Sequence, residues 1–249
     1  MGMFDSFIRK QKSEDDLVNS LVEIAAFGAG EESAHEKSNM DIVLAMVESN
    51  VTESSSSMLL YWLGIAWRNY TAWHIRGDDR KPYLERATNY FRQALEKSKH
   101  EWPMRQPLNK RHDGAYLDQI TIAGELGSML VEEKIIRNLD EGEKILRFVA
   151  DNTNEYEPCL CAYAELFYKR EEYEKAAIIA LDANNRALHS AEWKDGVPPA
   201  PIGIAGMSYR ALGRASKKAG DLAGAKKWFG ELIKLGVATE NDKKIYSKL

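Results

Sequence analysis

The fold is decided by residues 206–239, which read GMSYRALGRASKKAGDLAGAKKWFGELIKLGVAT. A second stretch of the same length, residues 157–190, aligns with it without a gap and reads EPCLCAYAELFYKREEYEKAAIIALDANNRALHS. The matched positions are Tyr209, Leu212, Gly213, Ser216, Leu222, Ala225, Phe229 and Leu232 in the first stretch, and Leu160, Tyr163, Ala164, Phe167, Tyr173, Ala176, Ala180 and Ala183 in the second. A helical repeat needs small residues where its two helices cross and bulky ones where each unit covers the next, so this match predicts stacked helix pairs.

Two weaker copies of the pattern precede these stretches. One has a long aromatic helix within residues 56–75, a break at Gly77, and a second helix that begins near Pro82. Its matched positions are Leu63, Gly64, Ala87, Phe91 and Ala94, and those of the other copy are Leu126, Gly127, Leu130, Gly142, Leu146 and Val149. Both copies are longer than the 34-residue frame, because extra residues separate their two helices.

Through these positions the chain resembles the tetratricopeptide repeat family over about residues 56–239. The resemblance implies an all-α fold, a TPR-like α-solenoid of antiparallel helix pairs in a right-handed superhelix with a concave, partner-binding surface. Leu188 and Val237 stand where the family often has proline after the second helix. Arg214 and Glu165 stand where chaperone-tail binding members carry clamp asparagines, so that partner is not expected.

The expected organisation is one solenoid with additions at both ends. Four helix pairs cover about 56–99, 113–152, 157–190 and 206–239, acidic N-terminal helices in 1–53 pack on them, and a C-terminal capping helix covers 240–249. Within 1–53, Ser13 is expected to cap a helix that Gly28 and Gly30 end, and a second helix is expected to bury one face, formed by Ile42, Val43, Met46 and Val47. Prolines at 198, 199 and 201 predict a rigid loop before the last pair, and no segment is expected to be a strand.

Composition excludes several classes of protein. Apolar residues make up 44% of the chain and charged residues 29%, with a net charge of −4, which is typical of a folded domain. No run reaches the roughly 18 apolar residues of a membrane span, and Met1 to Lys12 lacks the pattern of a signal peptide. We therefore expect a cytoplasmic protein that binds no membrane and, since it is not basic overall, no nucleic acid.

Charge is distributed unevenly. Residues 1–53 contain four Lys or Arg against eleven Asp or Glu, whereas residues 206–249 contain ten against four. Ends of opposite sign could attract one another between chains, so self-assembly into a homo-oligomer is one hypothesis.

Four of the basic residues recur at helical spacing on the first helix of the last repeat, namely Arg210, Arg214, Lys217 and Lys218. In the resembled family this helix generally faces the concave groove. The four could bind an acidic peptide or a carboxylate, because arginine offers paired hydrogen bonds and lysine a point charge. The alternative interpretation is a solvated helix face that balances the acidic end of the chain.

The aromatic helix within 56–75 also has two interpretations. Trp67 and Tyr70, with Trp62 and Trp73 beside them, could line a groove for a partner peptide, or they could be core residues between repeats. A third hypothesis is a helical small-ligand binder or enzyme with an internal pocket at Trp67, Tyr70 and His74.

The sequence contains no motif for catalysis or for a cofactor. Glycine-rich phosphate loops, dinucleotide fingerprints and serine elbows are absent, and Glu32 with His35 forms a single pair where an iron bundle needs two. Cys159 and Cys161 point to different sides of a helix, so neither a disulfide nor a metal site is expected. The expected function is a non-enzymatic adaptor or scaffold that binds another protein or peptide and uses no metal and no cofactor.

Overall fold

The computed structural model describes residues 12–25, 36–101, 106–107, 116–153, 157–189 and 199–249. These residues are almost entirely helical, which confirms the predicted all-α class. Where no strand was expected, Gln106–Pro107 (β1) pairs antiparallel with Tyr116–Leu117 (β2), but two residues a side make no sheet layer. The chain divides into two compact units, residues 1–122 and 123–249.

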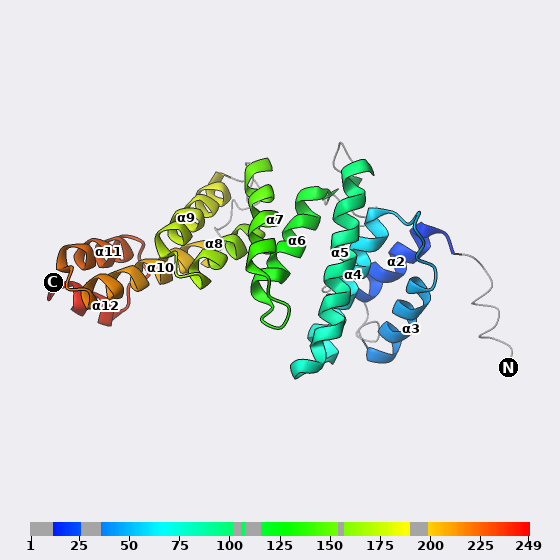
Figure 1. Ribbon diagram of the computed structural model, residues 1–249, viewed down its shortest axis with the longest axis horizontal. Coiled ribbons are helices and arrows are strands. Elements are labelled where there is room, and N and C mark those ends of the chain that lie inside the picture. Colours follow the sequence, from blue (N-terminus) through cyan, green and yellow to red (C-terminus); the bar gives the residue numbers. More distant parts are fainter. Residues whose placement is uncertain (1–11, 26–35, 102–105, 108–115, 154–156, 190–198) are drawn as a thin grey trace. The chain divides into compact units, whose positions relative to one another are not determined.

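Among the described residues of unit 1, one long helix, α4 (Ser57–His74), contacts three other helices (Figure 1). These are α2 (Glu14–Ala25), α3 (Lys37–Glu48) and α5 (Lys81–Glu101), the last of which follows a 3-10 turn, η2 (Gly77–Arg80). Helices α2 and α3 belong to the acidic segment of the chain, and both pack on α4.

The start of α2 is a reciprocal cap. The Asp16 N–H donates to Ser13 Oγ (3.2 Å), and the Ser13 N–H donates to the Asp16 carboxylate (3.3 Å). Two otherwise unpaired N–H groups are thereby satisfied, and the predicted Ser13 cap is confirmed. The predicted end at Gly28 and Gly30 lies outside the described residues.

The start of α4 is capped from three directions. The Leu59 N–H donates to Ser56 Oγ (3.2 Å), the Ser56 N–H donates to the Glu14 carboxylate (3.1 Å), and the Ser57 N–H donates to the Glu101 carboxylate (3.0 Å). Carboxylates are favoured here because the N-terminal end of a helix carries partial positive charge. The first turn of α4 is therefore tied to the start of α2 and to the end of α5.

The buried face of α3 differs from the one expected. The residues it buries are Met40, Leu44 and Val47, whereas the expected face was Ile42, Val43, Met46 and Val47. Ile42 is 58% exposed, so the prediction is wrong there, while Val47 is fully buried as expected. Met40, Leu44 and Val47 lie at the four- and three-residue steps of a single helical stripe, and the two hydrophobic sets overlap enough that periodicity alone did not separate them.

The packing of α4 on α5 follows the expected small-against-bulky pattern. Ala87, Phe91 and Ala94 of α5 are all fully buried, as predicted. A Cβ added at Gly64 of α4 would lie 2.7 Å from Phe91 Cε1, well inside van der Waals contact. Glycine at this position therefore lets the ring of Phe91 pack directly on the backbone of α4.

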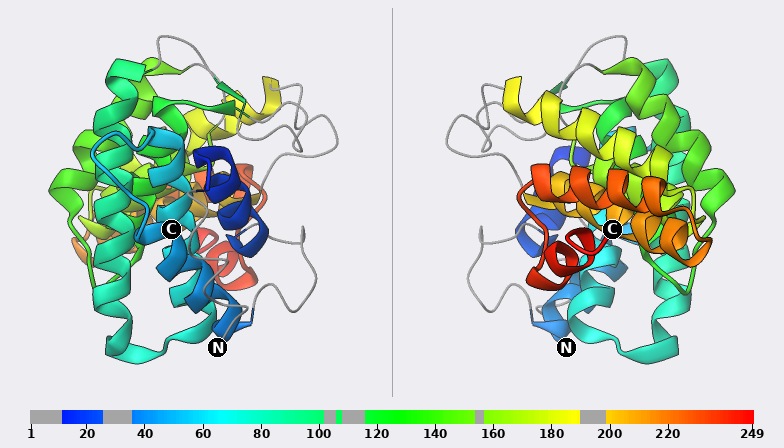
Figure 2. Two further views of the ribbon diagram at one scale, coloured as in Figure 1. Left: turned by 90° about the vertical axis from the view of Figure 1, so that its right-hand side faces the viewer. Right: turned by 90° about the vertical axis from the view of Figure 1, so that its left-hand side faces the viewer.

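Unit 2 is a succession of helices in which neighbours in sequence are neighbours in space (Figure 1), and its last helices, drawn in orange and red, are seen from the C-terminal side in the right-hand view of Figure 2. Its helices are α6 (Gln119–Glu132, of which the first residues belong to unit 1), α7 (Leu139–Asn152), α8 (Cys159–Lys169), α9 (Tyr173–His189), α10 (Pro199–Lys218), α11 (Leu222–Lys234) and α12 (Glu240–Tyr246).

The contact between Gly64 and Phe91 recurs in unit 2 at the matched positions. A Cβ at Gly213 would lie 2.8 Å from Phe229 Cε2, and one at Gly127 would lie 2.6 Å from Leu146 Cγ. In the remaining pair both positions are alanine, and the two lie in one buried cluster, Ala164 with Ala180. In each of the four helix pairs, a small residue of the first helix therefore packs at the same equivalent position of the second helix.

The proline-rich segment before the last pair was predicted as a loop, and this is wrong from Pro199 onward. Helix α10 begins at Pro199 and includes Pro201 in its first turn. Proline is tolerated there because first-turn N–H groups have no acceptor within the helix. Pro198 lies outside the described residues.

Candidate partner-binding surface

Helix α10 carries all four predicted basic residues, but the structure separates Arg210 from the others. Arg210 Nε donates to the Asp242 carboxylate of α12 (3.0 Å), and Arg210 Nη2 donates to the Val237 carbonyl (3.3 Å). The side chain of Asp242 is fully buried. Arg210 is therefore engaged in holding α12 to α10 and is not free to bind a partner, which corrects its place in the predicted stripe.

Asp242 also closes the capping box that starts α12. Its carboxylate accepts from the Thr239 N–H (2.9 Å) and hydroxyl (2.8 Å), and its own N–H donates to Thr239 Oγ1 (3.3 Å). Burial acts to raise the pKa of Asp242, but the hydrogen bonds from Thr239 and Arg210 outweigh it and hold the pKa below the ordinary value. One carboxylate thus starts α12 and docks it.

Arg214, Lys217 and Lys218 form the exposed part of the stripe, which we call the basic face of α10. Among the residues that the structure describes, none of the three makes an ion pair or a side-chain hydrogen bond. Lys217 and Lys218 lie in the last turn, where a positive charge is favoured by the helix dipole. The dipole accounts for their presence at a helix end, while their full charge stays available to an anion.

Apolar and aromatic groups also lie on α10 and α11. Met207 is 40% exposed on α10, three residues before Arg210. On α11 the Trp228 ring stacks with that of Tyr209 at 5.6 Å, and Lys227 Nζ sits 4.0 Å from the Trp228 ring centroid. Met207 lies two turns before Arg214 on the same side of α10, so this side combines exposed apolar area with positive charge.

Trp67 and Tyr70, the other two predicted site residues, lie inside unit 1. They are 6% and 2% exposed, and their rings meet edge to face at 5.4 Å. His74 packs on Tyr70 and Tyr83 stacks on Trp67, so the space around them is filled by other rings. The structure thus has the core arrangement that sequence analysis left open as the alternative to a groove.

The carboxylates of α3 bind these aromatic residues. Tyr70 Oη donates to Asp41 (2.7 Å), and a single oxygen of Glu48 accepts from both Trp67 Nε1 (2.9 Å) and Tyr90 Oη (2.8 Å). Burial, reinforced by the Glu48 carboxylate, raises the pKa of Tyr90 far above its usual range. Asp41 and Glu48 therefore attach α3 to aromatic side chains of α4 and α5.

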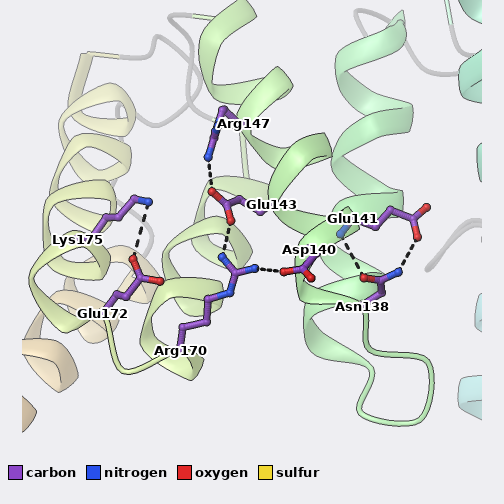
Figure 3. A network of polar contacts seen from close by, with 8 residues as sticks. All are labelled: Asn138, Asp140, Glu141, Glu143, Arg147, Arg170, Glu172 and Lys175. Atoms are coloured by element: carbon purple, nitrogen blue, oxygen red, sulfur yellow. Dashed lines mark hydrogen bonds and ion pairs between the residues drawn. The ribbon is translucent and has the colours of Figure 1, made fainter.

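A further charged network lies in unit 2, where Arg170 joins α7 to the end of α8 (Figure 3). Its guanidinium donates to Glu143 and to Asp140 (2.6 Å), and Glu143 also binds Arg147. The Arg170 hydrogen bond lowers the pKa of Glu143. Arg170 and Arg147 are thus paired with Asp140 and Glu143, so these four side chains form a charge-balanced network that joins α7 to the end of α8.

No metal site occurs among the described residues, where no three potential ligands gather. Neither cysteine forms a disulfide, and burial strongly raises the pKa of Cys159, so that thiol stays protonated. In the part of the chain that the structure describes, no helix is long and apolar enough to cross a membrane.

Comparison with known proteins leaves these surfaces as the guide to function, because no family model and no curated protein matches the sequence. Sequence reasoning located the basic face but missed the Asp242 partner of Arg210. The Thr-x-x-Asp spacing of Thr239 and Asp242, which is typical of a capped helix start, could have indicated that Asp242 has a structural role.

Proposed function

We propose that the protein is a non-enzymatic adaptor or scaffold whose unit 2 binds an acidic segment of another protein on the basic face of α10. The observation that carries this proposal is the difference in pairing along one helix. Arg210 is bound by a buried carboxylate, while Arg214, Lys217 and Lys218 are exposed and have no acidic partner among the described residues. Cations in this state attract a carboxylate-rich partner and hold it by charge-assisted hydrogen bonds.

The four-fold recurrence of one packing contact supports the TPR-like interpretation of the architecture. A small residue meets the matched position of the second helix in every pair, which is what a solenoid of equivalent helix pairs requires. In such a solenoid the first helices of the pairs line a concave surface, and α10 is one of these. The right-handed superhelix and its groove are part of the proposal.

The test is a binding measurement with a defined probe, a fluorescein-labelled peptide rich in Glu, titrated with the full-length protein at low and moderate salt. The double variant Arg214→Glu/Lys217→Glu is expected to weaken binding, by about fivefold to thirtyfold at low salt if each contact contributes up to about 1 kcal/mol. Arg210 is left unchanged, because its loss would also release Asp242.

The matched control is Lys134→Glu/Lys144→Glu, which changes the net charge of unit 2 by the same amount at two exposed lysines away from α10. Equal weakening by both double variants would mean that the probe responds to net charge alone. Binding that neither variant changes would remove the basic face from the model. Light scattering at low salt on the same samples reports whether oppositely charged chain ends drive self-assembly instead.

A further inference from the structure

The face of α4 that matches the basic face of α10 is already occupied by a helix. The contacts of Gly64 with Phe91 and of Gly213 with Phe229 show which positions of α4 and α10 are equivalent. Ile65 of α4 then corresponds to Arg214 of α10, and Asn69 to Lys218. In unit 1 the two corresponding residues, Ile65 and Asn69, are buried, and they lie one turn apart on the same face of α4.

Helix α2 is the element that lies along this part of α4. At one end the Glu14 carboxylate accepts from the Ser56 N–H (3.1 Å), and at the other Asn69 Nδ2 donates to the Ala25 carbonyl (2.6 Å). Helix α2 therefore runs beside α4 from its cap to its fourth turn (Figure 1). Its own composition combines an acidic first turn with a buried apolar side formed by Leu17, Val18, Leu21, Val22, Ile24 and Ala25.

The matched face of α10 has the shape for a helix but a different charge. Met207 matches Met58, and Ala211 and Ala215 match Trp62 and Ala66, so α10 presents an apolar strip with small residues in its middle. Met207 and Ala215 are exposed, and Ala211 is half-buried. Arg214 and Lys218 border this strip where α4 has Ile65 and Asn69.

From this correspondence we infer that the basic face of α10 binds a partner protein as an amphipathic helix, with apolar residues on the Met207–Ala215 strip and carboxylates against Arg214, Lys217 and Lys218. This inference rests on the proposed function and adds the conformation and chemistry of the partner. Charge complementarity selects the occupant, because an apolar helix without carboxylates would leave the bordering cations uncompensated. Alanines in the strip allow the two helix axes to approach closely.

The experiment compares two peptides of identical composition against the full-length protein. One is an Ala-rich helix with Leu at every third or fourth position and Glu along the border, flanked by proline at its ends. In its isomer those prolines stand in the middle, where they interrupt the helix. The helical peptide is expected to bind at least about tenfold more tightly and to gain helical circular dichroism on binding.

Ala215→Trp places a bulky side chain on the strip without replacing a cation, and Ala223→Trp adds the same side chain at an exposed position of α11 outside the strip. The first variant is expected to weaken binding of the helical peptide about tenfold, and the second to leave it unchanged. Circular dichroism of both variants confirms that each is folded.

The outcomes separate this inference from the proposed function. If both peptides bind equally well and Arg214→Glu/Lys217→Glu weakens both, the acidic-partner function stands and the helical mode is overturned. If neither peptide responds to that double variant, the proposed function fails as well. If the protein forms a dimer that Ala215→Trp abolishes, the occupant is a second copy of this chain, and the assignment to a partner protein is wrong.

Discussion

Units 1 and 2 use charge in opposite ways. In unit 1 the carboxylates Asp41 and Glu48 accept hydrogen bonds from the aromatic side chains of other helices, and each also pairs with a cation, Lys37 or Arg86. In unit 2 the cations Arg214, Lys217 and Lys218 face outward and have no acidic partner among the described residues. The opposite signs that the sequence analysis found at the two ends of the chain therefore serve different purposes, internal docking in one unit and an available surface in the other.

The largest expected effect comes from the feature that the units share, the ring packed against a glycine. Phe91→Ala in unit 1 and Phe229→Ala in unit 2 should each lower the free energy of unfolding by about 3–5 kcal/mol, because a fully buried ring leaves a cavity. Urea denaturation followed by circular dichroism measures the loss, and hydrogen exchange assigns it to a unit. A loss under about 1 kcal/mol in either variant would contradict the shared packing device.

The carboxylates of unit 1 that accept hydrogen bonds from aromatic side chains should rank second. Glu48→Ala leaves the Trp67 and Tyr90 donors without their acceptor, which should cost about 1–3 kcal/mol for each donor that stays buried. Tryptophan fluorescence during urea denaturation reports the change at Trp67. Glu53→Ala, at an exposed side chain of the same acidic segment, is the control and should have little effect.

The buried carboxylate of unit 2 should have a smaller effect that depends on pH. Asp242→Asn removes the charge that Arg210 binds, and the expected loss of stability at neutral pH is about 1–2 kcal/mol. Since the folded-state pKa of Asp242 lies below its ordinary value of 3.8, its stabilisation is complete above that value and is lost as the pH falls through the folded-state pKa. The difference between wild type and variant should therefore narrow in acid.

Urea denaturation at a series of pH values measures this narrowing directly. A difference that stayed constant down to the lowest pH at which the protein folds would show that the charge of Asp242 does not stabilise α12.

The smallest effect on stability is expected at the basic face, where the effect on binding should be largest. Arg214→Ala and Lys218→Ala should each change the free energy of unfolding by less than about 0.5 kcal/mol, because neither side chain has a partner to lose among the described residues. Thermal denaturation checks this. A loss of more than about 1 kcal/mol would mean that these cations help to hold the fold.

Local patterns in the sequence predicted the local structure well. The cap at Ser13, the long helix before Gly77 and the spacing that puts Ala87, Phe91 and Ala94 on one face of α5 all depend on residues within a few positions of one another. The predicted face of α3 was wrong because Ile42 and Met46 are as apolar as the residues that became buried. Only the position of α4 distinguishes the two sets.

The candidate site was predictable only in part, for the same reason. Spacing identified Arg210, Arg214, Lys217 and Lys218 as one helical stripe, but the pairing of Arg210 with Asp242 joins residues 32 positions apart. Trp67 and Tyr70 have the same spacing whether they line a groove or fill a core, and the neighbours that bury them, α3 and Tyr83, come from other elements. Side-chain pattern therefore indicated where charge and aromatic groups lie, while their use depended on contacts between distant residues.

The small-against-bulky contact also implies that the two residues at the crossing of a helix pair should be substituted together. Gly64 with Phe91 and Gly213 with Phe229 fill the crossing from one side, whereas Ala164 with Ala180 shares the volume between both helices. A single exchange between these solutions produces a clash or a cavity, but a paired exchange conserves the volume. Helix pairs of this protein should therefore be exchangeable when both crossing residues are moved together. Longer or shorter versions of the chain could be built in this way.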